Sequence, residues 1–485
     1  MRLCFALIAI AWTVPACYAD DITYSKHIAP ILYKHCASCH RAGEVGPFPL
    51  LSYKDAAKRA EFLKDITASR QMPPWKAEHG FGEFLDERRL SDEELKTIAK
   101  WADSGAPEGD PKDLPPAPTF PEGWHLGKPD LVLTMPQPFT VPAAGRDLQQ
   151  CFIVPIPITE DKTVVAVDFR PGNRKVVHHA ILYLDSTGAA RRKAGDAGYY
   201  STFGGPGFLP TGGLGSWAPG AEARRLPEGV GKFIRKGSDL VLQIHYHPNG
   251  KEEIDQSSVG VYFATKPAEK LVAGIGLISR TIDIPAGKSD YTVASDSAPL
   301  PADCTALSIG PHMHNIGRDM KVEARLPDGS VKPMIHVTDW DWNWQGAYYY
   351  KEPVRLPKGT VLHMEARYDN STANPRNPSN PPKRVRWGEQ TTDEMCLCGV
   401  QVVTDNKADL LKIVTMRGNQ LGLLLGGGVS REQLEGDGPR GDVAIPERFK
   451  GVLEQYDKNK DGKLSAEEIE AMPERLRTLV KMYLR

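Results

Sequence analysis

A series of short segments in which apolar and polar residues alternate, spread over residues 131–403, limits the fold of this chain more than any other feature. Successive side chains of a β-strand point to opposite faces, so this alternation predicts strands with one face against a core. Clear examples are residues 164–169, 239–245 and 320–324. Their regular spacing, with turn residues between them, is typical of antiparallel β-sandwiches. The length of the region predicts two sandwiches that divide near residues 266–269.

Length and composition favour a mainly β, multidomain protein. The chain has 485 residues, more than one hydrophobic core normally holds, and its 45 glycines and 40 prolines favour strands joined by turns over long helices. The 60 Lys and Arg residues balance 61 Asp and Glu residues, which leaves a formal net charge of −1. This balance argues against nucleic acid or an acidic lipid surface as a partner.

Residues 1–19 have the pattern of a secretory signal peptide. Arg2 precedes an apolar run over residues 3–14, and small residues come before Asp20. A rival interpretation is lipoprotein processing at Cys17, although Pro15 fits that motif poorly. No later stretch is apolar enough to span a bilayer. We therefore expect an exported bacterial protein, periplasmic or secreted, without a membrane span.

Residues 36–40, Cys-Ala-Ser-Cys-His, match the attachment signature of a c-type haem. Cys36 and Cys39 would form the two thioether bonds, and His40 would bring an imidazole to the iron. A redox or zinc CxxC pair is the alternative, but no second cysteine pair lies nearby in the sequence, and the adjoining histidine is what haem requires. We expect a small all-α cytochrome c domain over residues 20–106.

The sixth haem ligand is expected downstream of this motif. Met72 is the predicted ligand, because two prolines fix the backbone just after it and Met/His ligation raises the haem potential. His79 is the alternative ligand. Residues 90–101, with Ser91 as the cap, predict the closing helix of the domain. A Pro-rich linker follows over residues 107–127.

The segment around His312 and His314, together with Met395, suggests a metal site. On a strand the two histidines point the same way and can bind one ion. Imidazole suits copper, zinc or iron, whereas a thioether on a later strand selects Cu(I). The three residues indicate a copper that cycles through its reduced state. The alternative is a surface His-x-His pair and a methionine that fills the core.

Two earlier motifs also carry histidines: His178-His179 and, in Gln243-Ile244-His245-Tyr246-His247, a second pair. Adjacent histidines on a strand face opposite ways, so His178 and His179 can bind one ion only where the strand is twisted or bulged. Without such a distortion, one would be a core residue and the other a surface residue. Residues 204–231, rich in Gly and Pro, predict a long loop over this site.

Taken in order, the His-His pair, Gln-Ile-His-Tyr, His-Met-His and Asp-Glu-Met-Cys resemble the copper type II ascorbate-dependent monooxygenases, which include peptidylglycine α-hydroxylating monooxygenase and dopamine β-hydroxylase. The resemblance covers about residues 131–403 and implies two sandwich domains, here residues 128–266 and 267–430, with one copper in each. The implied ligands are His178, His179 and His245 for an electron-transfer copper, and His312, His314 and Met395 for the catalytic copper that binds O2. His247 has no counterpart.

The resemblance implies a monooxygenase that hydroxylates a C–H bond of a small organic substrate with O2. This reaction takes two electrons, and each copper stores one. The fused haem, ascorbate or a periplasmic redox partner would supply them. The alternative function is a non-catalytic copper and haem electron-transfer or copper-binding protein, which would keep the same ligands. A binding scaffold explains neither the haem motif nor the ordered histidines.

Three positions depart from the peptide-amidating members of this family. Those enzymes hold a substrate carboxylate with an Arg two residues before the His-x-His and with an Asn and a Tyr just after the Met. This chain has Gly310, Leu397 and Gly399 at these places, so a glycine-extended peptide is not the expected substrate. The aromatic stretch over residues 339–344 is expected to pack in a core or interface rather than to form a substrate wall.

Four cysteines remain outside the haem motif after export: Cys151, Cys304, Cys396 and Cys398. An even number in an oxidising compartment predicts one or two disulfides, without fixing their connectivity. In the family, the cysteine after the Met pairs with a neighbouring strand. The corresponding region here, residues 365–370, has no cysteine.

Residues 457–468 match an EF-hand calcium loop, in a C-terminal domain expected over residues 440–485. Gly462 supplies the sharp turn, and residues 445–456 and 466–484 predict the flanking helices, the second interrupted at Pro473. The predicted Ca²⁺ ligands are Asp457, Asn459, Asp461, Lys463 through its carbonyl, Ser465 and Glu468. An acidic exposed turn is the alternative. A single extracellular loop would bind Ca²⁺ with a Kd of about 10⁻⁴ to 10⁻³ M, which suits a structural or docking role.

Overall fold

The computed structural model describes residues 21–120, 123–202, 204–416, 419–425, 427–435, 443–445, 449–473, 476–477 and 480. The signal peptide predicted at residues 1–19, with Cys17, lies outside these residues. The chain divides into two compact units: unit 1 comprises Met1–Trp75 and Arg88–Thr119, and unit 2 comprises Lys76–Glu87 and Phe120–Arg485. The chain is mostly β in several sheets and 18% helical, which confirms the prediction of a mainly β, multidomain protein.

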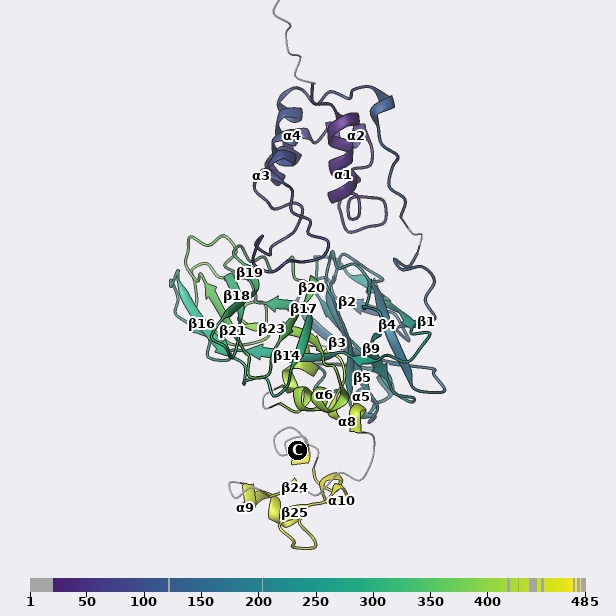
Figure 1. Ribbon diagram of the computed structural model, residues 1–485, viewed down its shortest axis with the longest axis vertical. Helices are drawn as coiled ribbons and strands as arrows, with labels where there is room; N and C mark the ends of the chain where they lie inside the picture. Colours follow the sequence, from purple (N-terminus) through teal and green to yellow (C-terminus); the bar gives the residue numbers. More distant parts are fainter. Residues whose placement is uncertain are drawn as a thin grey trace, which may run out of the picture. The chain divides into compact units, whose positions relative to one another are not determined.

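The regular structure of unit 1 is helical (Figure 1). Its elements are the π-helical turn η1 Tyr24–Ile28, α1 Ala29–His35, α2 Tyr53–Ala57, α3 Ala60–Ala68, α4 Asp92–Asp103 and the 3-10 turn η2 Pro111–Asp113. The predicted closing helix is α4. Ser91 and Glu94 cap it reciprocally, each side chain accepting from the other's backbone N–H. Trp101 on α4 is fully buried in a core shared with Ile28 and Leu32.

The first sandwich of unit 2 has two sheets, ordered β1-β12-β4-β9-β13, with β8 beside β4, and β6-β3-β10-β5-β7. Their strands are β1 Leu131–Thr134, β3 Leu148–Pro155, β4 Lys162–Arg170, β5 Val177–Asp185, β6 Tyr199–Ser201, β7 Gly212–Trp217, β8 Arg224–Arg225, β9 Val230–Ile234, β10 Asp239–Tyr246, β12 Ser258–Phe263 and β13 Lys270–Leu271. Val164, Leu182 and Leu242 belong to the single buried core that both sheets share. A ladder of β2 Phe139–Val141 with β11 Glu253–Asp255, the helix α5 Ala189–Ala194 and the 3-10 turn η3 Gly195–Ala197 complete this part.

The second sandwich also has two sheets, ordered β14-β23-β17-β20 and β16-β21-β18-β19 (Figure 1). Their strands are β14 Ala273–Ile278, β16 Tyr291–Asp296, β17 Cys304–His312, β18 Gly317–Arg325, β19 Val331–Val337, β20 Tyr348–Leu356, β21 Val361–Tyr368 and β23 Leu397–Val403, with a separate ladder of β15 Asp283–Ile284 and β22 Val385–Arg386. Ile309, Val322 and Met364 are fully buried, so inward residues of both sheets form the interior.

The alternating segments form the predicted strands, since residues 164–169 lie in β4, 239–245 in β10 and 320–324 in β18. The long loop predicted over residues 204–231 is wrong, because β7, β8 and the start of β9 lie there. Two glycines explain the error. A Cβ on Gly212 would lie 2.6 Å from Gln433 Oε1, and Gly215 has a φ of +122°. Strand β7 therefore needs glycine where the usual pattern has side chains.

Residues 76–87, which the sequence assigns to the haem domain, pack within unit 2. Ala77 forms an isolated bridge with Val337, and Phe84 forms one with Tyr350. Lys76 Nζ also lies 2.7 Å from Asp339 Oδ2. A segment of the N-terminal region therefore adds to the edge of the second sandwich.

The predicted disulfides are absent among the described cysteines: Cys36, Cys39, Cys151, Cys304, Cys396 and Cys398 are free. A disulfide needs Cα atoms within about 7 Å of each other. Cys398 pairs with Pro311 near one end of β17, whereas Cys304 begins the other end. Cys151 lies on β3, in the other sandwich. The strand register therefore keeps these thiols apart.

Beyond β23 the described helices are α6 Lys407–Val414, α7 Gln420–Leu424, α8 Arg431–Glu435, α9 Lys450–Leu453, the 3-10 turn η5 Glu454–Tyr456 and α10 Ala466–Glu470. The last of these ends before Pro473, where the sequence predicts an interruption. In the predicted EF-hand loop, β25 Lys463–Leu464 pairs with β24 Val443–Ala444. Over the described ranges, no helix is long and apolar enough to cross a membrane.

Candidate metal centres

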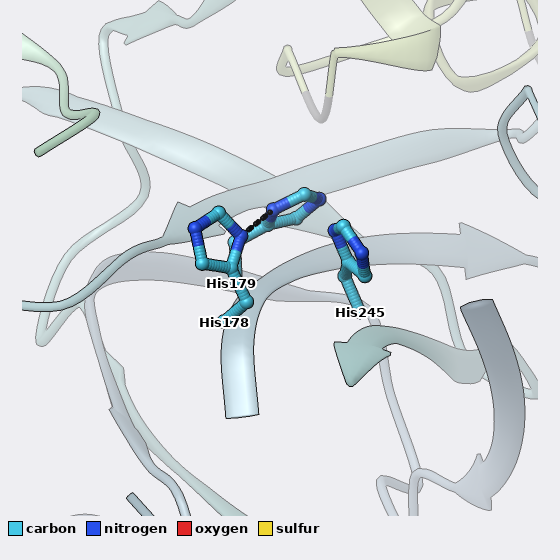
Figure 2. A group of neighbouring side chains, drawn as sticks. All are labelled: His178, His179 and His245. Atoms are coloured by element: carbon cyan, nitrogen blue, oxygen red, sulfur yellow. Dashed lines mark hydrogen bonds between the residues drawn. The ribbon is translucent and has the colours of Figure 1, made fainter. Parts of the chain in front are cut away.

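A bulge in β5 brings its adjacent histidines together. His245 on β10 pairs with His179, whereas the next residue, Tyr246, pairs with Val177. His178 is therefore an extra residue in β5, which is the distortion that two neighbouring ligands require. One potential ligand atom from each of His178, His179 and His245 lies within 4.8 Å of the other two (Figure 2). We call these residues the first cluster.

Two buried ring nitrogens of the first cluster, His178 Nε2 and His245 Nδ1, have no hydrogen-bond partner. The Nδ1 atoms of His178 and His179 are 3.1 Å apart. His245 Nε2 donates to Asp147 Oδ2 over 3.1 Å, so in the neutral ring Nδ1 carries a lone pair, and this buried atom has no hydrogen-bond partner. Buried polar atoms are normally paired. A bound copper would satisfy these lone pairs, so the residues present fit the ion.

Burial keeps His178 and His179 of the first cluster unprotonated at neutral pH. Burial, and then the nearby charge of His245, lowers the pKa of His178 to about 3. The same two causes hold the pKa of His179 well below its ordinary value. A metal ligand must offer a lone pair instead of a proton, so neither ring has to lose a proton at neutral pH before binding.

The Asp147 carboxylate orients the first cluster and is also the hydrogen-bond partner of His247. Its carboxylate accepts from His245 Nε2 and, over 2.8 Å, from His247 Nδ1. Burial opposes ionisation of Asp147, but these two hydrogen bonds outweigh it and lower its pKa to about 2. A carboxylate behind a ligating imidazole fixes the orientation and tautomer of the ring. His247 is thus the second histidine on the carboxylate that orients His245.

His312 and His314 form the second cluster, with ring centroids 5.2 Å apart and ring planes at 90°. His312 ends β17, and His314 lies just beyond the strand. Met313 between them is fully buried, as expected for side chains that alternate between two faces. Burial lowers the pKa of His312 to about 4 and that of His314 to about 3.

Hydrogen bonds from Nδ1 orient both rings of the second cluster. His312 Nδ1 donates to Gln345 Oε1, and the Gln345 amide is oriented by its own donation to the Trp342 carbonyl. His314 Nδ1 donates to the Asp393 carbonyl over 3.1 Å. Because each Nδ1 carries the proton, each Nε2 carries the lone pair. The two imidazoles therefore fit a metal bound through Nε2.

Met395 precedes β23 and does not lie on a strand, contrary to the prediction. His312 pairs with Leu397, so two further steps along each chain bring His314 opposite Met395. Glu394 holds this arrangement, because its Oε2 accepts from the backbone N–H groups of His314 and Met395, over 2.9 and 3.1 Å. Ligation of copper by the Met395 thioether stays a prediction.

One segment, residues 338–347 between β19 and β20, contacts both clusters, and we call it the bridging segment. Trp342 stacks on His178, with ring centroids 3.8 Å apart and an interplanar angle of 9°. Gln345 binds His312, as described above, and Trp340 Nε1 donates to the His314 carbonyl over 2.9 Å. The aromatic stretch over residues 339–344 therefore packs against other residues, as expected from the sequence. Its packing partners are the predicted copper ligands.

In unit 1 the haem motif forms a turn that continues from α1. The His40 N–H donates to the Cys36 carbonyl over 2.8 Å, and His40 Nδ1 donates to the Phe48 carbonyl over 3.0 Å. Nε2 of His40 is thus left for an iron ligand. Gly46 allows this approach, since a Cβ there would lie 2.8 Å from His40 Nδ1. These residues fit an attached haem.

The remaining predicted ligands stay predictions. Met72 follows α3 and is partly buried. His79 belongs to unit 2, where its exposed ring lies 3.3 Å from Glu87. In the loop predicted to be an EF-hand, Asp457 accepts from the Gly462 N–H over 2.9 Å, and Glu468 accepts from the Lys458 N–H over 2.7 Å. The predicted ligands Asn459, Asp461, Lys463 and Ser465 lie in the same loop.

Among curated proteins, the chain is similar to human "DBH-like monooxygenase protein 1", with 25% identity over 283 residues. The match covers 53% of this chain and 44% of the human protein, so the chain spans less than half the length of this relative. No protein-family model matches.

Similarity to solved structures is weak. The major capsid protein P2 of bacteriophage PM2 has 12% identity and a TM-score of 0.22, over 56% of this chain and 96% of that protein. The VP2 subviral particle of infectious bursal disease virus has 10% identity and a TM-score of 0.16, over 64% and 76% of the two chains. These scores carry no argument about fold or function.

Three residues at the clusters have no place among the sequence predictions: Asp147, Gln345 and Glu394. The first two have no local signal, because their partners are far away in the sequence. Glu394 directly precedes Met395, and an acidic residue beside a ligand in a buried segment could have been suspected.

Replacing Glu394 by Ala is expected to destabilise unit 2. The buried N–H groups of His314, Ile316 and Met395 would lose their acceptor, and each such loss costs about 1–3 kcal/mol. We expect the free energy of unfolding, measured with urea, to fall by about 3 kcal/mol or more. Copper bound at the second cluster should be lost as well. Glu352→Ala on the exposed face of β20 is the control, and an equal effect there would contradict this role.

Two outer partners are expected to affect the clusters separately. Removing Asp147 frees His245, and removing Gln345 frees His312. Loss of such a partner weakens metal binding by about 10–100-fold. Competitive Cu(I) titrations should therefore show weaker binding at the first cluster in Asp147→Ala and at the second in Gln345→Ala. Each titration is made with the other cluster inactivated, by His314→Ala or His179→Ala. Equal weakening of both clusters by either variant would contradict the assignment.

Proposed function

We propose that the chain is an exported copper monooxygenase with its own c-type haem domain. It hydroxylates a C–H bond of a small organic substrate with O2. The first cluster, His178, His179 and His245, holds the copper that passes electrons. The second, His312 and His314 with Met395, holds the copper that meets O2. The electrons come from the haem, held through Cys36, Cys39, His40 and Met72, from ascorbate or from a periplasmic redox partner.

The observation that carries this proposal is the pair of buried histidine clusters, each oriented by an outer hydrogen-bond partner. Their motifs follow one another in the order of the copper type II monooxygenases. The distant similarity to a human protein named as a monooxygenase supports the same class of activity. The export signal and the haem motif favour an oxidising compartment and a built-in electron carrier.

The residues of the chain hold the ligating imidazoles in position and in buried, water-poor surroundings. Asp147 and Gln345 fix the tautomers of His245 and His312, so the ligating nitrogens need no reorganisation. When bound, copper would supply one-electron storage at each cluster and the activation of O2. Hydroxylation of R–H consumes O2, two electrons and two protons, and yields R–OH and water. The haem, ascorbate or a periplasmic redox partner supplies the two electrons, so the reaction is balanced.

A second candidate function is a non-catalytic copper and haem electron-transfer protein. Gly310, Leu397 and Gly399 favour it, because the family's grip on a substrate carboxylate is missing at these positions. The same three residues fit an oxygenase that acts on another small substrate.

Oxygen consumption separates the two functions. The copper-loaded full chain with ascorbate is expected to take up O2 in step with a hydroxylated product from at least one member of a panel of small organic compounds. Met395→Ile should lower this turnover at least about tenfold, because the thioether favours reduced copper. Full turnover by that variant would contradict the assigned oxygen site. Electron transfer without any hydroxylated product would favour the second candidate.

The haem relay is tested by anaerobic mixing. Chain with reduced haem, loaded with Cu(II), is expected to reoxidise its haem, whereas the copper-free chain is not. The haem absorbance reports the reaction. An unchanged haem spectrum in the copper-loaded chain would exclude the relay and leave ascorbate or an external partner as the donor.

A further inference from the structure

A cavity of about 330 Å³ lies between the two sandwiches of unit 2. Its wall combines Phe169, Leu182 and Trp217 of the first sandwich with Leu307 and Tyr350 of the second. In the described part of the chain, the six proposed copper ligands are not among its lining residues. Interfaces between domains are preferred places for small-molecule sites, and this volume is at the lower end of their range.

Lys232 on β9 projects into this apolar surrounding and is only 6% exposed. Its ammonium donates to the Leu214 carbonyl over 2.6 Å. No carboxylate of the described residues pairs with it, and burial alone lowers its pKa to about 8. A buried ammonium without a counter-ion is destabilising, so a chain rarely retains one without a use for it.

The other charged groups of the lining already have partners or face solvent. Asp168 accepts from the backbone N–H and Nδ1 of His125. Arg224 pairs with Asp86, and Arg225 lies over the Tyr262 ring. Glu222 is exposed. Among the charged lining groups, Lys232 is therefore the buried one whose charge is not neutralised within the described residues.

A second buried polar group of the cavity lacks a hydrogen-bond partner. Gln401 on β23 lines the cavity, and its Oε1 is buried without a hydrogen bond. A buried ammonium without a counter-ion and a buried acceptor without a donor thus share one apolar cavity. An apolar molecule would change neither, and water alone would leave the ammonium without a counter-charge.

We propose that this cavity binds a small organic carboxylic acid with an apolar body, whose carboxylate pairs with the Lys232 ammonium. The apolar body lies against the aromatic and aliphatic wall from both sandwiches. The bound acid stabilises the packing of the sandwiches, because it contacts both. This site is separate from the proposed copper chemistry and does not depend on it.

Calorimetric titration of the copper-free full chain tests the site, with octanoate as the probe. Octanoate is expected to bind with one molecule per chain. Octan-1-ol, which lacks the charge, and acetate, which lacks the apolar body, should each bind at least tenfold more weakly. Absence of octanoate binding, or equal binding of octan-1-ol or acetate, would overturn the proposal. Copper loading should leave the octanoate affinity unchanged, and binding that requires copper would place the acid at the histidine clusters instead.

Variants locate the probe. Lys232→Met should weaken octanoate binding at least tenfold, Lys232→Arg should retain most of it, and the exposed Lys236→Met should have no effect. Unchanged binding in Lys232→Met would overturn the proposal. Thermal unfolding shows whether the variant folds, and we expect its Tm at pH 7 to equal or exceed that of the wild type, since an unpaired buried charge is removed.

The pH dependence gives an independent readout. The pKa of Lys232 is lower in the folded chain, about 8, than in the unfolded chain, so the unfolded chain binds the proton more tightly. Wild-type stability should therefore rise relative to Lys232→Met as the pH rises from 8 toward the ordinary lysine range. Octanoate affinity should fall over the same interval, because the ammonium is lost. A pH-independent affinity would contradict a carboxylate–ammonium pair.

Discussion

The structure of unit 2 depends on buried imidazole nitrogens that the protein satisfies on one side of the ring only. Asp147 and Gln345 each accept a hydrogen bond from one ring nitrogen, and the opposite nitrogen is left with a lone pair inside the protein. Leaving a buried polar atom unpaired costs about 1–3 kcal/mol. The bulge at His178 and the Glu394 carboxylate, which ties two backbone segments together, both serve to hold these nitrogens in place.

The two clusters are also connected to each other. Trp342 stacks on His178 while Gln345, three residues later, binds His312, so the bridging segment cannot shift without disturbing a ring in each cluster. Charge connects them too, because His245 contributes to the low pKa of both His312 and His314. This is a continuous physical link between sites that belong to different sandwiches. Occupation of one cluster by a cation would thus bear on the other.

The sequence predicts the strands and the histidines of the clusters well, since alternation and motif spacing are local properties. The bulge in β5 follows from the sequence only if His178 and His179 bind one ion, because neighbouring side chains on a regular strand cannot face one ion. The outer hydrogen-bond partners of these histidines could not be predicted from the sequence. Asp147 is 98 residues from His245, and Gln345 is 33 residues from His312, so only the folded topology brings them together.

Other failures have equally physical causes. Strand β7 lacks the alternation of apolar and polar residues, because it has glycines where a close approach or a positive φ requires them. The disulfide prediction rests on the number of cysteines and the expected compartment. Neither gives the distances between the cysteines, which the strand register sets.

The departures from the peptide-amidating pattern can now be divided into two kinds. Gly276, Gly399 and Gly310 pair across three neighbouring strands, on the face that carries His312. A Cβ on Gly276 would lie 2.7 Å from Leu421, and one on Gly399 would lie 3.2 Å from Leu425, so close packing of the α7 region accounts for these two glycines. At Gly310 the nearest atom would be 3.6 Å away, an ordinary contact. Packing does not explain the missing side chain at Gly310, which leaves an open position beside His312.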